Sequence, residues 1–507
     1  MSPLVIDSAR NRNVSTSNTL SCAIGALRIP VWIGVFCALL TTNADPDLWG
    51  HVRFGLDTLL TGRLTTTDPY SYTSDIPWLN HEWLAEVIMG GAYWTSGSGG
   101  LVVLKIVLAL ATLALMAPVF RRVSEHWRWP AAFLAIAALG PVALTIRPQL
   151  WTVLFVVGLC RILNAAPAYR WSLPPMFALW VNLHGGWIVG AGILILWSAL
   201  EIVGLASGRA SSWWISFGVP ALCAASTLTN PYGAKAWVFI ATTVRLSRPG
   251  IVEWQPLWMQ PLDAFVLWLL TLCWATFAVR RARVVRPEAM AIAVCLPFAS
   301  LYVVRLLPLF VAVSIVLLLP YVQQLTLATQ RVWPKGRTLV DVAFICIGVL
   351  ALAQPASPTC IQMQGSWQPD TAAARALAIA RPSGRLATTF NWGEYAIWHF
   401  GPLARVSIDG RRETVYSDQQ LRRQLAITLG ENAGFEELAR TMPEYVWLPV
   451  APSERTRQWL TAHEYRIDIQ TPQSFVAVRS DLPRIEPARL GIAPCFPGLQ
   501  TGDGVRL

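Results

Sequence analysis

Long apolar stretches constrain the fold of this chain more than any other feature of its sequence. A helix needs about 20 mostly apolar residues to cross the hydrocarbon core of a bilayer. We predict about eleven spanning helices, at 24–43, 100–120, 130–146, 148–164, 172–184, 186–206, 213–229, 258–279, 287–304, 305–323 and 338–355. Because 54% of the residues are hydrophobic and only 14% are charged, the chain is predicted to be an α-helical polytopic membrane protein.

Charge is distributed unevenly along the chain. The net charge is +11, but from residue 356 onward 16 arginines stand against 15 aspartates and glutamates. The positive excess therefore belongs to the membrane part, where arginine and lysine in short loops mark the cytoplasmic side. It gives no reason to expect a nucleic-acid partner. The same charge count predicts a cytoplasmic N-terminus and an extracytoplasmic C-terminal region.

Three parts follow from this orientation. Residues 1–23 form a cytoplasmic tail, residues 24–355 a transmembrane domain with a first external loop at 44–99, and residues 356–507 an extracytoplasmic domain. In the last part strands alternate with helices, which predicts a soluble α/β domain. The strands are expected at 385–391, 404–409, 444–449, 465–470 and 474–479. Cys360 and Cys495 flank this domain, and their spacing leaves open whether they pair in an oxidising compartment.

The first external loop begins with two carboxylates, Asp45 and Asp47, at the end of the first span. Apolar residues then repeat at helical spacing, which predicts an amphipathic helix that lies in the plane of the membrane surface. Asp47 is either the N-cap of this helix or a member of a site. His51 follows one turn later on the same face, and Asn80 is expected to cap a second helix over 81–95.

Acidic residues beside the lipid headgroups can act as bases toward a hydroxyl or hold a divalent cation. His81 and Glu82 open the second helix of the loop and add an imidazole and a third carboxylate. A metal site built from Asp45, Asp47, His81 and Glu82 is one alternative, although no spacing matches a zinc signature.

Further polar residues lie at the predicted outer ends of spans. Arg147 and Arg305 either snorkel to the interface or clamp a phosphate, whose geometry a guanidinium matches. His184 lies in a Leu-His-Gly-Gly run, where it packs at a helix break or binds a ligand. Asn230 opens an Asn-Pro-Tyr-Gly stretch, which is a turn signal first and a site candidate second.

Taken together, these motifs resemble a bacterial group of multi-span proteins and, through the first-loop acids and the topology, the GT-C superfamily of membrane glycosyltransferases. That superfamily includes protein O-mannosyltransferases, aminoarabinose transferases and oligosaccharyltransferase catalytic subunits. The matching residues are 45–51 (D-x-D-L-W-x-H), 68–73, 81–84 (H-E-W-L), 147–149, 182–186, 230–233 and 409–411 (D-G-R). One departure is Gly50, where the bacterial group commonly has a second tryptophan.

The resemblance implies transfer of a sugar from a polyprenyl-phosphate donor to a glycan, lipid or protein acceptor, at the outer face of a bacterial cytoplasmic membrane. Asp45 or Asp47 would be the general base, and Arg147 and Arg305 would stabilise the departing phosphate. His81 and Glu82 would orient the base or bind a cation. The remaining expected substrate contacts are His51, His184 and Asn230.

Two other classes stay open. A transporter or flippase would need ionisable residues near the middle of its spans, of which the sequence offers few. A non-catalytic assembly protein would tolerate changes in the first-loop acids.

Overall fold

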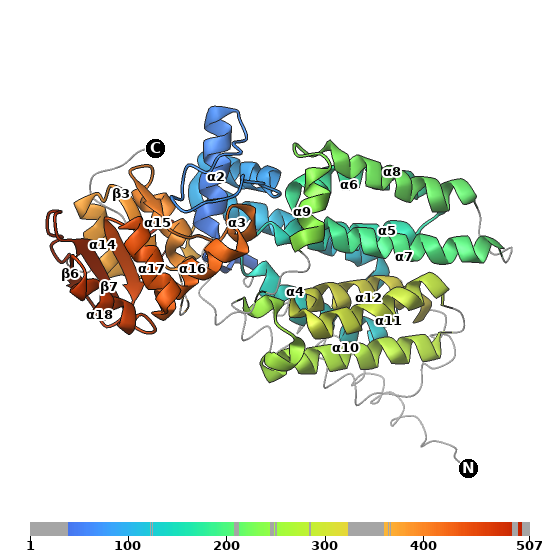
Figure 1. Cartoon of the computed structure of the whole chain (residues 1–507). Coiled ribbons are helices and arrows are strands. Elements are labelled where there is room, and N and C mark those ends of the chain that lie inside the picture. The colour runs from blue at the N-terminus through green and yellow to red at the C-terminus, as the bar shows by residue number, and fades with distance from the viewer. Residues whose placement is uncertain are drawn as a thin grey trace, which may run out of the picture. The chain divides into compact units, whose positions relative to one another are not determined.

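The computed structural model describes residues 39–121, 123, 125–206, 212–243, 248, 251–282, 285–322, 359–363, 365, 367–488 and 495–498. The chain forms two compact units (Figure 1). The bundle unit comprises Met1–Thr42, Ala109–Leu144 and Pro249–Pro358, and the site unit comprises Asn43–Leu108, Thr145–Arg248 and Thr359–Leu507. The predictions for the tail at 1–23, for most of the span at 24–43 and for the span at 338–355 fall outside the described residues.

Helix α12 is the centre of the bundle unit. It contacts α4, α10 and α11, and its side chains from Leu309 to Leu319 are buried. The helices of this unit are α4 (Glu125–Ala143), α10 (Leu262–Arg281), α11 (Pro287–Tyr302) and α12 (Leu307–Val322), with short turns η4 (Val252–Trp254), η5 (Leu257–Met259) and η6 (Val304–Leu306). An apolar helix that is buried on all sides is typical of the interior of a helical bundle.

The site unit contains a second group of helices. They are α5 (Gln149–Asn164), α6 (Leu173–Leu183), α7 (Trp187–Ala206), α8 (Val219–Ser226) and α9 (Lys235–Thr243), with η1 (Pro167–Ser172), η2 (Trp214–Gly218) and η3 (Thr227–Thr229). Helix α5 packs against α6 and α7, and α6 packs against α8. A long helix, α3 (Trp83–Arg121), begins in the site unit and continues into the bundle unit.

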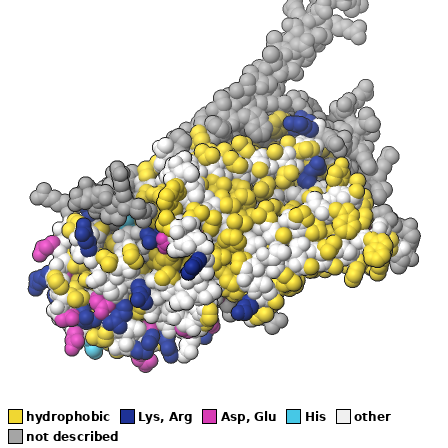
Figure 2. All heavy atoms as spheres, turned by 90° about the horizontal axis from the view of Figure 1, so that it is seen from above, with side chains coloured by type: hydrophobic (Ala, Val, Ile, Leu, Met, Phe, Trp, Pro, Cys, Tyr) yellow, Lys and Arg dark blue, Asp and Glu magenta, His cyan; other side chains and the backbone are white. Residues whose placement is uncertain are grey.

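Within the described residues, four helices are long and apolar enough to cross a membrane: Trp83–Arg121, Trp187–Leu205, Leu262–Arg281 and Val304–Val322. Many apolar side chains on three of them are exposed, for example Val107, Ile195 and Leu269. In Figure 2 such side chains spread over the helical part, whereas charged side chains gather over the C-terminal sheet. The predicted spans between 100 and 323 coincide with helical segments, but several are shorter than a membrane crossing, so the total of eleven stays a prediction.

The first external loop contains the two helices that its sequence predicts. The first is α2 (Leu48–Thr61), whose buried face includes Trp49 and Phe54. The second is the first part of α3, which ends where Ser96 and Gly97 leave the helical conformation. Whether α2 lies in the plane of the membrane surface stays a prediction. Its apolar face packs on protein, because the Trp49 ring meets those of Trp367, Tyr395 and Phe496 of the C-terminal segment.

The C-terminal segment folds around a five-stranded mixed sheet in the order β4-β3-β5-β7-β6. The strands are β3 (Gly384–Thr388), β4 (Ala404–Val406), β5 (Tyr445–Pro449), β6 (Tyr465–Gln470) and β7 (Ser474–Arg479), close to their predicted positions. Strands β4, β3 and β5 are parallel, and β7 is antiparallel to β5 and β6. The helices are α14 (Thr371–Ala380), α15 (Gly393–Phe400), α16 (Asp418–Leu429), α17 (Asn432–Thr441) and α18 (Glu454–Ala462), with η8 (Phe390–Trp392) and η9 (Arg412–Thr414).

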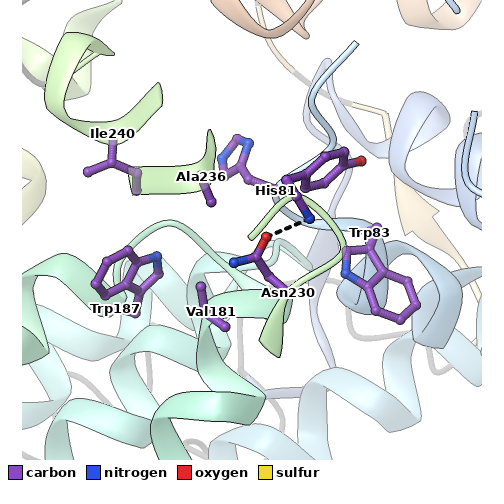
Figure 3. Close-up of a pocket in the computed structure, with 8 residues that line it drawn as sticks. His81, Trp83, Val181, Trp187, Asn230, Ala236 and Ile240 are labelled. Carbon is purple, nitrogen blue, oxygen red and sulfur yellow. Dashed lines mark hydrogen bonds between the residues drawn. The ribbon is translucent and has the colours of Figure 1, made fainter. Parts of the chain in front are cut away.

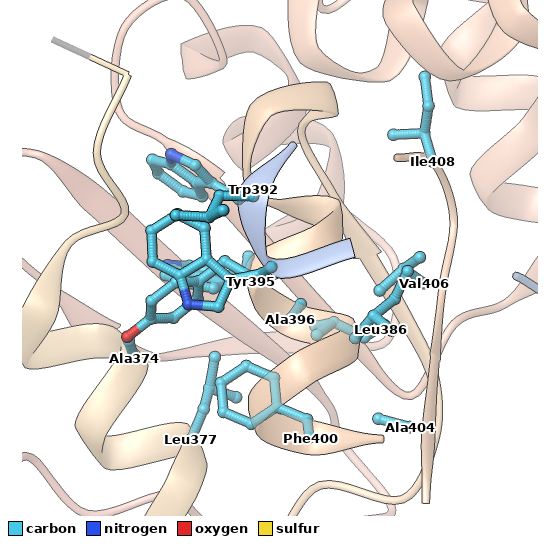
Figure 4. Packing of buried hydrophobic residues seen from close by; sticks show 14 of the residues in the cluster. Ala374, Leu377, Leu386, Trp392, Tyr395, Ala396, Phe400, Ala404, Val406 and Ile408 are labelled. Atoms are coloured by element: carbon cyan, nitrogen blue, oxygen red, sulfur yellow. The ribbon is translucent and has the colours of Figure 1, made fainter. Parts of the chain in front are cut away.

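This segment and the first loop share one apolar core. Leu377 of α14 lies beside Phe400 of α15, and Trp392 lies above Tyr395 (Figure 4). The same cluster includes Trp49 and Phe54 of α2. Short strands β1 (Thr42–Asn43) and β2 (Ile361–Gln362) lie at the entrances to the loop and to the segment, and Ala44 N–H donates to the Gln362 carbonyl. Cys360 and Cys495 form a disulfide, one of the two states that their spacing left open.

Candidate functional site

Asp45 and Asp47 converge on one guanidinium. Arg147 Nε donates to Asp45 Oδ2, and Arg147 Nη2 lies 3.4 Å from Asp47 Oδ2. Asp45 also accepts the Asp47 backbone N–H at 2.9 Å. The Asp45 side chain is 9% exposed and that of Asp47 is 32% exposed. Asp45 is therefore the more buried carboxylate, which holds the arginine and the turn, and Asp47 is the more exposed one.

Asp47 occupies the N-cap position of α2 but makes no capping hydrogen bond with its side chain. The Gly50 N–H that such a cap would take donates instead to Glu394 Oε2 at 3.0 Å. Both alternatives drawn from the sequence are thus partly realised, since Asp47 starts the helix while its carboxylate faces Arg147.

The D-G-R motif joins the C-terminal segment to the first loop. Arg411 Nη1 and Nη2 donate to Asp68 at 2.7 and 2.9 Å, and Arg411 Nη2 donates to Asp409 Oδ2 at 2.7 Å. Its guanidinium also lies 4.8–5.2 Å from three ring centroids, those of Phe54, Tyr70 and Trp78. An arginine with two buried carboxylates and three aromatic neighbours has a structural function. These contacts fix the loop in place.

His51 pairs with Glu86, a residue one turn into α3. His51 Nδ1 lies 3.2 Å from Glu86 Oε1, and Asn80 Nδ2 donates to Glu86 Oε2 at 2.5 Å. Burial of the imidazole lowers its pKa, but the hydrogen bond to Glu86 and the charges of Glu82, Glu86 and Asp47 outweigh this and raise the pKa of His51 to about 9. His51 is therefore a cation at neutral pH.

This ion pair predicts a pH-dependent loss of stability. The pKa of His51 is about 9 in the folded chain and 6.5 as the unperturbed value, so its stabilisation, about 3 kcal/mol, is complete below pH 6.5 and is lost as the pH rises through 9. We expect His51→Gln to lower the apparent melting temperature at pH 6.5 and to change it little at pH 10. An equal effect of the variant at both pH values would contradict the assignment.

Glu82 lies between two imidazoles. Its Oε1 is 3.5 Å from His81 Nε2 and 3.5 Å from His184 Nε2. Burial raises the pKa of Glu82, but the hydrogen bond and charge of His81 and the charges of His184 and His51 lower it well below its usual range. Burial also lowers the pKa of His81. Its hydrogen bond to Glu82 and the charges of nearby carboxylates outweigh burial and raise the pKa above its usual value. The group is therefore an ionised carboxylate with imidazole neighbours.

The tautomer of His184 follows from its contacts. Its Nδ1 accepts the Gly186 N–H at 3.0 Å and lies 2.7 Å from Thr152 Oγ1, which itself accepts Trp180 Nε1–H at 3.0 Å. The proton of a neutral His184 is therefore on Nε2, facing Glu82. A methyl group at Gly186 would lie 2.3 Å from Thr152 Oγ1 and 2.8 Å from His184 Nδ1, which explains the second of the two glycines after this histidine.

His81 also lines a small hollow of about 10 Å³, which is room for about one water molecule. Its lining residues come from four separate stretches of the site unit (Figure 3): His81, Trp83, Val181, Trp187, Asn230, Tyr232, Ala236 and Ile240. Asn230 points its Oδ1 at the Tyr232 N–H, 2.8 Å away, and its Nδ2 donates to the carbonyls of Thr227 and Gly233. Asn230 thus holds its own turn as well as lining the hollow.

Arg305 belongs to the bundle unit, apart from the other candidates. Its Nη1 donates to Glu253 Oε1 at 2.9 Å, and its guanidinium lies 5.5 Å from the Trp254 ring centroid. The expected pairing of Arg305 with Arg147 on one phosphate stays a prediction.

Sequence reasoning missed several members of the site. Glu394 follows a strand end but lies almost 350 residues from the loop that it contacts, and Thr152 lies inside an apolar helix with no distinguishing signal. Asp68 was singled out only as part of the 68–73 motif. For a metal, the described residues contain no group of three or more His, Cys, Asp or Glu side chains arranged to hold an ion. The proposed reaction involves no metal ion.

Two solved structures share this fold. The arabinofuranosyltransferase AftD from Mycobacteria matches 89% of the chain with 13% identity and a TM-score of 0.52, and the chain spans 41% of AftD. ArnT from Cupriavidus metallidurans, solved with undecaprenyl phosphate, matches 92% of the chain over its full length, with 13% identity and a TM-score of 0.51. No protein-family model and no curated protein matches the sequence.

Both proteins are GT-C glycosyltransferases. The chain shares the fold of these two proteins.

Proposed function

We propose that the chain is a membrane glycosyltransferase that moves a sugar from a polyprenyl-phosphate donor to an acceptor hydroxyl. The observation that carries the proposal is the accessible Asp47 carboxylate beside Arg147 at the start of the first loop, in a fold shared with two glycosyltransferases. One of these structures, ArnT, is bound to undecaprenyl phosphate, which supports a lipid-linked donor.

The reaction forms a bond between the acceptor oxygen and the anomeric carbon of the sugar. The bond from that carbon to the phosphate oxygen breaks, and its electron pair leaves with polyprenyl phosphate. Asp47 takes the proton of the acceptor hydroxyl as general base. Arg147 orients Asp47 and offers positive charge to the departing phosphate. Attack from the face opposite the phosphate inverts the anomeric carbon.

The remaining site residues have supporting functions in this proposal. His51 and Glu86 hold the start of α3 against α2, and His81, which pairs with Glu82, lines the hollow. Arg305 is proposed to bind a phosphate. The disulfide between Cys360 and Cys495 supports an extracytoplasmic C-terminal segment, since disulfides persist in oxidising compartments.

The test is consumption of a labelled donor. Purified full-length protein is incubated with polyprenyl phosphates that carry aminoarabinose, arabinofuranose or mannose, together with membrane and envelope extracts as acceptors. We expect one donor to be converted to polyprenyl phosphate with the label in an acceptor. No consumption of any donor, with transport of the labelled lipid across proteoliposomes instead, would favour the flippase alternative.

A further inference from the structure

The first turn of α2 is completed by a side chain from the far end of the sequence. An N-cap side chain normally accepts the N–H two or three residues further on. For the N-cap Asp47 these donors belong to Trp49 and Gly50, yet the Asp47 side chain makes no capping bond. Glu394 Oε2 accepts the Gly50 N–H instead, at 3.0 Å.

We infer that Glu394 is a positioning residue of the proposed transferase: by capping α2 it leaves the Asp47 carboxylate to Arg147 and the acceptor. The catalytic consequence rests on the proposed function, whereas the capping contact does not depend on it. The C-terminal segment would thereby be part of the active site and not an appendage.

Two glycines make room for this arrangement. A methyl group at Gly50 would lie 2.1 Å from Glu394 Oε2, and one at Gly410 would lie 2.4 Å from Asp47 Oδ1 and 2.7 Å from Glu394 Oε1. The carboxyl groups of Asp47 and Glu394 therefore both face Gly410. A tryptophan at position 50, as in the bacterial group, would need the space that Glu394 fills.

The backbone conformation of Asp47 is also consistent with Glu394, and not Asp47, capping the helix. Its φ of −86° and ψ of −6° are helical, whereas a residue that caps with its own side chain is usually extended. From this conformation Asp47 Oδ2 lies 3.4 Å from Arg147 Nη2. Without Glu394, the Gly50 N–H would lose this acceptor. The Asp47 carboxylate, three residues earlier in the sequence, could then replace it.

Glutamine is a close mimic of Glu394 here. Burial, then the charges of Asp47 and Asp409, raise the pKa of Glu394 well above its usual range, with Glu86 adding to this and Arg411 opposing it. The raised pKa favours the protonated, uncharged form of the side chain, and an amide oxygen can accept the same N–H.

The test compares Glu394→Ala with Glu394→Gln in the full-length protein. We expect Glu394→Ala to lower kcat about tenfold, the loss expected from one hydrogen bond, with KM nearly unchanged, and Glu394→Gln to keep most of the activity. Glu437→Gln is the matched control, since Glu437 is buried in the same segment and bonds to Gln420, Gln424 and Arg440. Unchanged kcat in Glu394→Ala, or an equal loss in the control, would overturn the inference.

A second readout needs no activity. Hydrogen exchange of the Gly50 amide should stay slow in Glu394→Ala, because Asp47 rotates to cap the helix, and should become fast only when Asp47→Ala is added. Full loss of protection in Glu394→Ala, with no further effect of Asp47→Ala, would contradict the inference. If no donor is consumed by the parent protein, the proposed function fails, while the exchange result still decides the capping.

Discussion

Replacing Asp47 by asparagine should reduce sugar transfer by about a hundredfold to ten-thousandfold, the range that a positioned general base contributes. Asparagine keeps the size of the side chain and its contact with Arg147 Nη2, 3.4 Å from the present carboxylate oxygen, but it cannot take a proton. The loss should therefore appear in kcat, with little change in KM for the lipid donor. The measurement is release of polyprenyl phosphate by the purified full-length variant.

Asp45→Asn should also be severely impaired, for a different reason. Asp45 holds Arg147 and the Asp47 N–H, so the variant misplaces the guanidinium and should raise KM for the donor as well as lower kcat. The two variants are thus distinguishable. Normal membrane insertion serves as the control for both, and full activity in both would remove the proposed base.

Arg411→Met should destabilise the site unit by about 3–5 kcal/mol, the cost of breaking a buried ion pair from one side. The methionine fills part of the space but leaves the carboxylates of Asp68 and Asp409 buried, with side chains 1% and 0% exposed. It also removes the cation from Phe54, Tyr70 and Trp78. The apparent melting temperature of the purified protein and the rate of proteolysis in the first loop should both report the loss.

Arg422→Met provides the matched control. Arg422 pairs with Asp418 at 2.7 Å on the surface of α16, where its side chain is 72% exposed, and such surface pairs are worth about 0–1 kcal/mol. If Arg411→Met changed the melting temperature no more than Arg422→Met, the D-G-R motif would not be the clamp described above.

Local patterns in the sequence placed most helices and strands correctly. The strand at Tyr465–Gln470 and that at Ser474–Arg479 have the predicted bounds, because alternation of apolar residues and turn signals is a local property. The capping of the second loop helix was also predictable: Asn80 Oδ1 accepts the Glu82 N–H at 3.1 Å. The position of α2 was not, because an amphipathic face can be covered by lipid or by protein, and the sequence does not say which.

The sequence predicted which residues form the candidate site better than it predicted how they are arranged. Asp45, Asp47 and Arg147 do meet, and Glu82 does lie beside His81 and His184. Their hydrogen-bond partners were hidden, because Glu394, Thr152 and Asp68 come close to them only through long-range folding.

By itself, the sequence determined the membrane class, the helical elements and the chemical types available at the surface, since these follow from hydropathy, periodicity and residue identity. Only the tertiary structure decided that the Asp47 carboxylate is accessible and that the Asp45 carboxylate is held by hydrogen bonds. That depends on burial and on partners: Arg147 lies on Asp45, Glu394 takes the Gly50 N–H, and Asp47 keeps an exposed oxygen.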